Sequence, residues 1–450
     1  REVIEVASRL NKEEGMTVIL ITHFMEEALL ADKAVIINKG ELVASGTPAE
    51  IFERGEQLES FNLALPEISV IRNEIRAAGL EIGDCLYPEK FAEEIAKLAE
   101  VKFFKMRSLG HIPAPIDEEE AEIPQDNAQN GENTVNNDKN DNWDVDIRDL
   151  TYTYSAKSPF ATKALKGVNL HISEGEFFGI IGHTGSGKST LVQHLNALIK
   201  LPKAGKRYKK PRVKKGQTPP AEPSITIGKY DLANKKCDWG ALRADVGMVF
   251  QYPEYQLFAD TVFADVAFGL KNFKKGLSKE EIETAVKDSL EAVGLNYEEV
   301  KDKSPFDLSG GQKRRAAIAG VIVTKPKILV LDEPAAGLDP IGKRDIMKLL
   351  HSLHGDWCKT VIIVSHDMDE IAENCTRACV VSDGTIYACD TPSNLFKDKD
   401  GLYSLGLDVP LTAKICDELS KRGIEVDCDF TAKGFARAVI EGFNGGVANA

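Results

Sequence analysis

Short runs of apolar residues recur along the chain from residue 177 onward. The clearest are 177–181 (FFGII), 246–250 (VGMVF), 328–331 (ILVL) and 360–364 (TVIIV). Apolar runs of this length are typical of strands that are buried on both faces of a sheet. Residues 278–295 instead carry apolar side chains at helical spacing, which predicts an amphipathic helix. The pattern as a whole predicts an α/β domain.

Part of this pattern occurs twice. Residues 17–23 (TVILITH) match 360–366 (TVIIVSH), and 65–82 match 409–426. The offset is 343 residues at the first match (360 minus 17) and 344 at the second (409 minus 65). Because half of an α/β domain cannot bury its sheet, we expect the first copy to be the end of a longer domain and the chain to be a fragment of a tandem protein. A degenerate remnant domain is the alternative.

The repeat sets the expected domain boundaries. They are a truncated first domain at 1–109, an acidic linker at 110–143, a complete domain at 144–404 and a C-terminal helical region at 405–450. The linker is rich in Asp, Glu, Asn, Gln and Pro and poor in apolar residues. Such a segment cannot offset its ordering entropy by burial, so it is predicted to be disordered.

Composition narrows the function classes. Hydrophobic residues make up 43% and charged residues 28% of the chain, as in a soluble globular protein, and no apolar run reaches the roughly 18 residues of a membrane span. The net charge of −14 argues against nucleic acid as a partner. The 8 cysteines are interpreted as reduced thiols. A basic segment at 200–223 is either a solvated loop or a contact with lipid headgroups or another polyanion.

A glycine-rich segment follows the first of the buried strands. Residues 182–189 (GHTGSGKS) match G-x-x-x-x-G-K-[ST] at the start of a helix, where backbone N–H groups and the helix dipole can face one anion. Lys188 is expected to reach the β and γ phosphates, and Ser189 to ligate Mg²⁺. The nucleotide-binding residues predicted here are Gly182, His183, Thr184, Gly185, Ser186, Gly187, Lys188, Ser189 and Thr190.

Polar side chains end the other buried strands. Asp332 is expected to hold Mg²⁺ through water, and Glu333 to polarise the attacking water. His366 is expected to touch the γ-phosphate, and His23 occupies the equivalent position in the first copy. Gln251 follows its strand at once and is expected to sense Mg²⁺ and the water. The predicted catalytic residues are Glu333, His366 and Gln251, and the predicted metal ligands are Ser189, Gln251 and Asp332.

A second anion-binding helix start lies at 308–312 (LSGGQ). Ser309 offers a hydroxyl group and Gly310 and Gly311 expose backbone N–H groups, followed by Gln312. One nucleotide needs only one cradle, so this one is expected to close over a nucleotide held by another domain. Tyr154 is expected to stack on adenine, and Tyr152 and Phe160 are alternatives.

These motifs, in this order, resemble the ABC ATPase family over about 144–400, and about 1–60 resembles the end of a second such domain. The resemblance implies a P-loop NTPase fold, namely a RecA-like α/β core with a mostly parallel sheet, an antiparallel β subdomain near 145–180 and an α-helical subdomain near 255–310. It also implies that ATP and Mg²⁺ lie between the phosphate loop of one domain and the LSGGQ of a second ABC ATPase domain, with Asp339 at the seam.

Residues 250–272 and 304–322 resemble more closely the ATPases of energy-coupling factor transporters. This resemblance implies ATP hydrolysis that energises import of a vitamin or a transition-metal ion such as cobalt or nickel. It implies a transmembrane coupling subunit, a substrate-binding membrane subunit and a peripheral position on the cytoplasmic face of the membrane. The tail 405–450 resembles the helical region that helps these ATPases pair. A soluble ribosome-associated ATPase of the ABC-F type, or a regulatory ATP-binding module, is the alternative.

Overall fold

The computed structural model describes residues 2–22, 24–52, 65–101, 142–156, 158–201, 223–274 and 276–445, together with Leu58, Phe61 and Leu63. The predicted linker, apart from its last two residues, lies outside the described residues, as do His23 and the interior of the basic segment. Among the described helices, none is both long enough and apolar enough to cross a bilayer.

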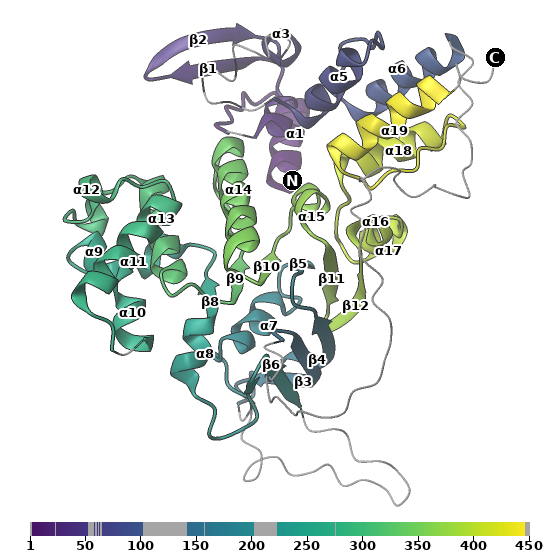
Figure 1. The fold of residues 1–450 in the computed structure, drawn as a ribbon. Coiled ribbons are helices and arrows are strands. Elements are labelled where there is room, and N and C mark those ends of the chain that lie inside the picture. The colour runs from purple at the N-terminus through teal and green to yellow at the C-terminus, as the bar shows by residue number, and fades with distance from the viewer. Residues whose placement is uncertain are drawn as a thin grey trace, which may run out of the picture.

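A six-stranded sheet forms the centre of the molecule (Figure 1). Its order is β12 (Thr385–Asp390), β11 (Arg377–Ser382), β5 (Phe177–Ile181), β10 (Thr360–Val364), β9 (Ile328–Asp332) and β8 (Val246–Val249). Neighbouring strands are parallel except β12, which runs antiparallel to β11. The four apolar runs of the sequence thus form four adjacent strands, and the predicted parallel sheet is confirmed.

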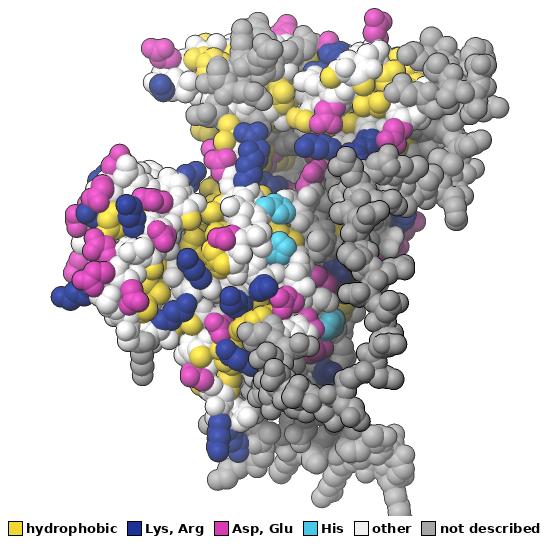
Figure 2. Space-filling view, in the orientation of Figure 1, with side chains coloured by type: hydrophobic (Ala, Val, Ile, Leu, Met, Phe, Trp, Pro, Cys, Tyr) yellow, Lys and Arg dark blue, Asp and Glu magenta, His cyan; other side chains and the backbone are white. Residues whose placement is uncertain are grey.

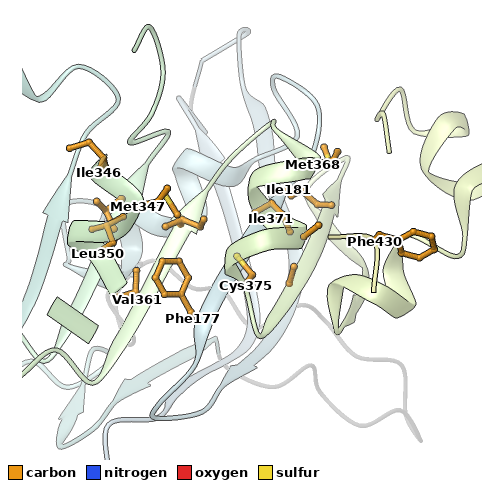
Figure 3. Close-up of a cluster of buried hydrophobic side chains, with 14 of the residues drawn as sticks. Phe177, Ile181, Ile346, Met347, Leu350, Val361, Met368, Ile371, Cys375 and Phe430 are labelled. Atoms are coloured by element: carbon orange, nitrogen blue, oxygen red, sulfur yellow. The ribbon is translucent and has the colours of Figure 1, made fainter. Parts of the chain in front are cut away.

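The two faces of this sheet belong to different cores because side chains alternate along each strand. On β5, Phe177 and Ile181 contribute to one core and Phe178 and Ile180 to the other. The first face packs against α14 (Pro340–Asp356) and α15 (Met368–Asn374), which supply Met347, Leu350 and Ile371 (Figure 3). The strand ends are therefore held between two apolar layers.

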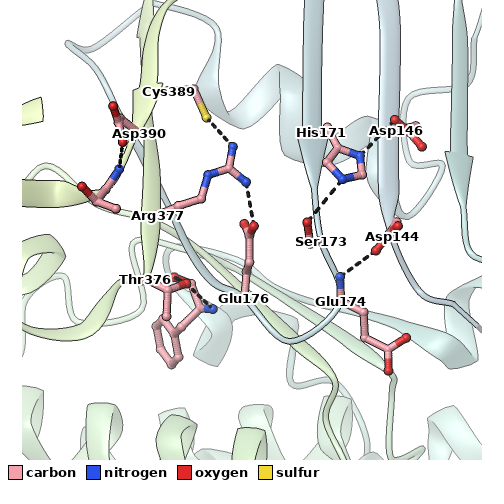
Figure 4. Close-up of polar contacts among 12 residues, drawn as sticks. Asp144, Asp146, His171, Ser173, Glu174, Glu176, Thr376, Arg377, Cys389 and Asp390 are labelled. Atoms are coloured by element: carbon pink, nitrogen blue, oxygen red, sulfur yellow. Dashed lines mark hydrogen bonds and ion pairs between the residues drawn. The ribbon is translucent and has the colours of Figure 1, made fainter. Parts of the chain in front are cut away.

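An antiparallel sheet covers the other face. It has the order β4 (Thr162–Ile172), β3 (Val145–Tyr154), β6 (Ser224–Ile227) and β7 (Tyr230–Asp231). Trp143, at the end of the predicted linker, is only 4% exposed and belongs to the same apolar core as this sheet. Figure 4 shows polar contacts near the starts of strands in both sheets, among them the pair at 2.6 Å between Arg377 on β11 and Glu176, directly before β5 of the central sheet.

A layer of helices lies beside the sheet. It runs from η1 (Pro253–Gln256) through α9 (Val262–Val266), α10 (Phe268–Phe273), α11 (Lys279–Ala292), α12 (Tyr297–Val300) and η2 (Pro305–Asp307) to α13 (Gly310–Ile322). The predicted amphipathic helix is α11, which begins with a capping box between Ser278 and Glu281. Figure 2 shows Lys, Arg, Asp and Glu side chains interspersed over this layer. The remaining helices of the domain are α7 (Lys188–Leu195), α8 (Trp239–Asp245), α16 (Pro392–Leu395) and α17 (Lys399–Ser404).

Each described element of the first copy has a counterpart in the second. These elements are α1 (Glu2–Glu14), α2 (Met25–Ala28), β1 (Ala34–Asn38), β2 (Glu41–Gly46), α3 (Pro48–Phe52), α5 (Glu67–Ala77) and α6 (Pro88–Val101). At the offset of the repeat they correspond to α14, α15, β11, β12, α16, α18 (Leu411–Ser420) and α19 (Ala432–Gly445). One expectation is wrong: residues 17–21 form no strand, and Ile19 and Ile21 are 87% and 95% exposed. Their counterpart β10 lies between β5 and β9, and the described part of the first copy provides no strand equivalent to either.

The two helical tails pack against each other. Helix α6 contacts α18, and α5 contacts α19 (Figure 1). Phe91 and Phe435 occupy equivalent positions, both are fully buried, and their ring centroids are 6.5 Å apart. The exchange of partners between equivalent helices is the contact pattern of a local two-fold axis.

Candidate active site

The phosphate loop joins β5 to α7 at the carboxyl end of the central sheet. Gly182, Gly185 and Gly187 all have positive φ angles, of 155°, 83° and 110°. A Cβ atom on Gly182 would lie 2.3 Å from the Val381 carbonyl oxygen, and one on Gly187 would lie 2.7 Å from that of Ala164. Glycine is therefore required at both ends of the loop by backbone conformation and by space.

Lys188 is buried and curls back over this loop. Its Nζ atom donates to the carbonyl oxygens of Gly182 at 2.6 Å and His183 at 3.0 Å. Burial lowers the pKa of the Lys188 ammonium, while the nearby carboxylates of Glu333 and Asp332 act in the opposite sense. The lysine thus stands between the phosphate loop and the acidic end of β9.

Asp332 ends β9 and lies next to Ser189. Burial raises the pKa of the Asp332 carboxyl, and a hydrogen bond with Ser189 opposes that rise. The structure therefore brings together two of the predicted metal ligands, which come from residues more than a hundred positions apart in the sequence. A carboxylate and a hydroxyl oxygen are the kind of donors that suit Mg²⁺.

The Glu333 carboxylate, after β9, is contacted by side chains that follow β8 and β10. Gln251 Nε2, after β8, donates to its Oε2 at 2.5 Å, and His366 Nδ1, after β10, lies 3.4 Å from its Oε1. The contact with His366 lowers the pKa of Glu333, and the same contact raises the pKa of His366. All three predicted catalytic residues are thus in one contact group, at the carboxyl ends of adjacent strands.

Arg314 is a residue of this site that the sequence analysis missed. It lies on α13, is 5% exposed, and donates to the carbonyl oxygens of Pro334 at 2.5 Å and Ala336 at 2.7 Å. Its Nη2 atom is also 3.4 Å from the Glu333 carbonyl oxygen. The helix that begins at LSGGQ is thereby tied to the segment that carries Glu333. Lys313, Arg314 and Arg315 are adjacent, and only packing decides which of them points inward.

The LSGGQ residues lie at the exposed start of α13. Ser309 Oγ accepts from Gln312 N at 3.4 Å, and Ser309 N donates to Gln312 Oε1 at 3.1 Å, which forms a capping box. A Cβ atom on Gly310 or Gly311 would meet nothing within 4 Å. Asp339 is exposed too, and its Oδ1 caps α14 by accepting from Gly342 N. Among the described contacts, none joins these residues to the phosphate loop of the same chain.

Tyr154 and Tyr152, two of the predicted candidates for adenine stacking, both contact α7. The Tyr154 hydroxyl lies 3.1 Å from Thr190 Oγ1, and the Tyr154 ring is 40% exposed. Tyr152 instead packs edge-on against the fully buried His194. Phe160 is 83% exposed at a turn. Of the three aromatics, Tyr154 therefore combines an exposed ring with an anchored hydroxyl group.

Fold and site together define an ABC-type ATPase. The profile of the family described as ABC transporter matches residues 165–336. A protein of Caldanaerobacter subterraneus subsp. tengcongensis named energy-coupling factor transporter ATP-binding protein EcfA2 is 44% identical over 285 residues, which cover 63% of this chain and 92% of that protein. The protein of that name from Clostridium perfringens is 43% identical over 298 residues, or 66% and 97% of the two chains.

The chain belongs to the energy-coupling factor transporter ATP-binding proteins, a group of ABC transporter ATPases. Like the family, it is an ATPase. A solved structure described as cbiO1 from Clostridium perfringens, part of the ABC transporter complex cbiONQ, is 35% identical and covers 59% of this chain and 95% of its own, with a TM-score of 0.47.

Proposed function

We propose that residues 144–404 bind ATP at the phosphate loop and hydrolyse it with Glu333 as the residue that polarises water. The convergence of Gln251 and His366 on the Glu333 carboxylate carries this proposal. An ionised carboxylate can accept a proton from water, and its lowered pKa keeps it ionised at neutral pH. Lys188 and the loop N–H groups neutralise phosphate charge, His366 contacts the γ-phosphate, and Tyr154 stacks on adenine.

Mg²⁺ fits the oxygen donors at this site. Ser189 would ligate the ion directly, Asp332 through water, and Gln251 from the strand beside it. Among the described residues no cluster of three or more His, Cys, Asp or Glu could hold a metal ion. Mg²⁺ keeps several waters and takes substrate phosphates as ligands. When bound, the ion would offset negative charge on the phosphates.

The exposed LSGGQ start and Asp339 would meet a second ABC ATPase domain. A helix start with two glycines in open space is suited to a phosphate group. It would close over a nucleotide held elsewhere, in another copy or another domain. ATP would draw the two domains together, and hydrolysis would release them.

The cycle would power an importer of a vitamin or of a transition-metal ion such as cobalt or nickel. The relatives named energy-coupling factor transporter ATP-binding proteins support the transporter role, and the substrate class rests on the resemblance of residues 250–272 and 304–322. We place the chain on the cytoplasmic face of the membrane, beside a transmembrane coupling subunit and a substrate-binding membrane subunit. The segment after Gln251 would touch the coupling subunit, since Tyr255 there is 84% exposed.

Glu333→Gln tests the catalytic assignment. The variant should bind ATP with near-normal affinity and lose at least about 100-fold in kcat, because the amide cannot accept the proton. Turnover and nucleotide binding are measured on the same preparations, with Glu283→Gln in the helical layer as the matched control. Near-normal turnover of Glu333→Gln would remove the assignment.

Affinity purification tests the transporter role. The tagged protein is recovered from native membranes in mild detergent, and its companions are identified by mass spectrometry. A polytopic coupling protein with a small substrate-binding membrane protein is the expected result, and the latter indicates the substrate. Ribosomes, or no membrane protein, would favour the soluble ABC-F alternative and leave the ATPase chemistry intact.

A further inference from the structure

Two cysteines of the C-terminal tail contact each other. Cys416 lies on α18 and Cys428 in the segment that leads to α19, and their Sγ atoms are 3.9 Å apart. Cys416 is 8% exposed and Cys428 is partly exposed. All 8 cysteines of the chain are free thiols, so this contact is between two thiols rather than within a disulfide.

The equivalent positions in the first copy of the repeat are occupied by an ion pair. At the offset of 344 residues, Cys416 corresponds to Arg72 (416 minus 344) and Cys428 to Asp84 (428 minus 344). Arg72 Nη1 and Asp84 Oδ1 form an ion pair at 3.0 Å. In the first copy an ion pair therefore ties the helix to the segment that follows it, and in the second copy two thiols occupy the same two positions.

The two thiols are chemically unequal. The contact with Cys416 lowers the pKa of Cys428 against the opposing effect of burial, and a bond with the backbone of Phe430 also lowers it. The same contact, with burial, raises the pKa of Cys416. The more accessible sulfur is thus the one that more readily becomes a thiolate, and a protonated thiol lies next to it.

We propose that Cys416 and Cys428 form a reversible dithiol–disulfide site that reacts with low-molecular-weight disulfides. The Cys428 thiolate attacks one sulfur of the reagent, forms a mixed disulfide and expels one thiolate. Cys416 then attacks Cys428 Sγ, forms the intramolecular bond and expels the second thiolate, which takes the Cys416 proton. Two protein thiols are oxidised and one reagent disulfide is reduced to two thiols.

The bond would stiffen the contact between the two tails. It would tie α18 to the segment before α19, where Thr412 already donates to the Phe430 carbonyl oxygen at 2.6 Å. Helix α19 begins two residues after Phe430 and carries Phe435, which packs on Phe91 of the first copy. Oxidation would therefore give the second copy a covalent tether at the position where the first copy has an ion pair. The site is separate from the ATPase chemistry.

The test is exposure of the whole chain to oxidised glutathione, followed by tryptic digestion without reductant. Cleavage after Lys414, Lys421 or Arg422, and Lys433 places the two cysteines in separate peptides, so a disulfide keeps 415–421 or 415–422 joined to 423–433. We expect this linked pair in the wild-type chain, a glutathione adduct on Cys428 in Cys416→Ser, and no linked pair in either single variant. Cys237→Ser, which removes a partly exposed thiol elsewhere, should leave the linked pair unchanged.

A stability measurement completes the test. Oxidation should raise the Tm of the wild-type chain by about 5 °C and leave that of Cys416→Ser unchanged. Cys416→Arg/Cys428→Asp, which introduces the ion pair of the first copy at the equivalent positions, should fold and should form no linked peptides with oxidised glutathione. Absence of the linked peptides in the wild-type chain, an unchanged Tm on oxidation, or failure of the ion-pair variant to fold would overturn the proposal.

Discussion

Glu333 has a backbone conformation that non-glycine residues adopt infrequently. Its φ angle is 50°, and its N–H group is held by the Val364 carbonyl oxygen at 2.9 Å. Arg314 stabilises the same turn by donating to the carbonyl oxygens of Glu333 and Pro334. A strained residue persists where its surroundings fix it, and here they fix the position of the carboxylate between Gln251 and His366.

Arg314→Ala should therefore affect both stability and catalysis. It leaves the buried carbonyl oxygen of Pro334 and the partly buried one of Ala336 without their donor, which should cost about 2–3 kcal/mol of unfolding free energy. The kcat should fall at least about tenfold with little change in ATP affinity, since the phosphate loop is untouched. Urea unfolding and steady-state kinetics check this, with the neighbouring, half-exposed Arg315→Ala as control. Equal effects of the two variants would refute the role given to Arg314.

The Glu333–His366 pair makes a pH-dependent contribution to stability. The lowered pKa of Glu333 adds stability above its ordinary value of 4.5, which is lost as pH falls through the lowered value. The raised pKa of His366 adds stability below its ordinary value of 6.5, which is lost as pH rises through the raised value. Both contributions are present between these ordinary values.

His366→Gln should thus lower the free energy of unfolding most near about pH 5.5 and least near about pH 9. Because the His366 side chain is 70% exposed, solvent screening limits the cost to a few tenths of a kcal/mol, and at most about 1 kcal/mol. The measurement is urea unfolding of both proteins across this range. In a Glu333→Gln background the pH dependence of the difference should vanish, and its persistence there would assign it to another partner.

At the scale of elements, α15 links the active site to the tail. It begins two residues after His366, and two of its carboxylates reach the N-termini of the tail helices. Asp369 Oδ1 accepts from Leu411 N at 2.8 Å, at the start of α18, and Glu373 Oε1 accepts from Ala432 N at 2.7 Å, at the start of α19. The cap residue of α18 is Pro410, which has no side-chain cap, so Asp369 takes that role from another element.

Asp369→Ala should destabilise the protein by about 1 kcal/mol, the usual cost of losing a helix cap. Asp369→Asn keeps an acceptor oxygen, and its stability relative to the wild-type chain should depend on pH. Burial raises the pKa of Asp369 to about 6, so ionisation costs stability as pH rises from 3.8 through that value. At pH of about 8 the Asn variant should be at least as stable as the wild-type chain. Thermal unfolding at about pH 5 and 8 tests this, and equal losses in both variants would contradict the capping role.

At the scale of the whole molecule, the paired tails join segments that are 344 residues apart (435 minus 91). Phe91 and Phe435 lie at the local two-fold axis, and both are fully buried. The apolar faces of four helices, two from each copy, are covered by this contact. The repeat is thus part of the architecture, because each copy of the tail completes the core of the other.

Phe91→Ala and Phe435→Ala should each lower the free energy of unfolding by about 3–5 kcal/mol. The loss in the double variant should be smaller than their sum by about 1 kcal/mol. Denaturant unfolding of the four proteins gives the coupling energy. Phe52, buried in the first copy but in a different cluster, provides the control pairing with Phe435, which should be additive. Additivity of the Phe91 and Phe435 variants would show that the tails do not meet there.

Local sequence patterns were sufficient for much of the site. The phosphate-loop glycines, Ser309 as a helix cap and the carboxylates that end β9 follow from chemistry within one segment, since a tight turn or a strand end needs few distant residues. The four buried strands followed from four apolar runs, because strands buried on both faces leave little room for polar side chains, and their parallel arrangement was implied by the resemblance to the ABC ATPase family. The amphipathic spacing of 278–295 likewise predicted α11.

Tertiary packing decided the rest. Arg314 was missed because its direction depends on the fold of α13 onto the segment after β9. Residues 17–21 repeat the sequence of β10 and yet form no strand, because a strand exists through its neighbours and not through its own apolar residues. The sequence alone determined which local structures and reactive groups the chain carries. Their convergence on Glu333, and the contact between two helical tails far apart in the sequence, arise only when distant segments bury the same surface.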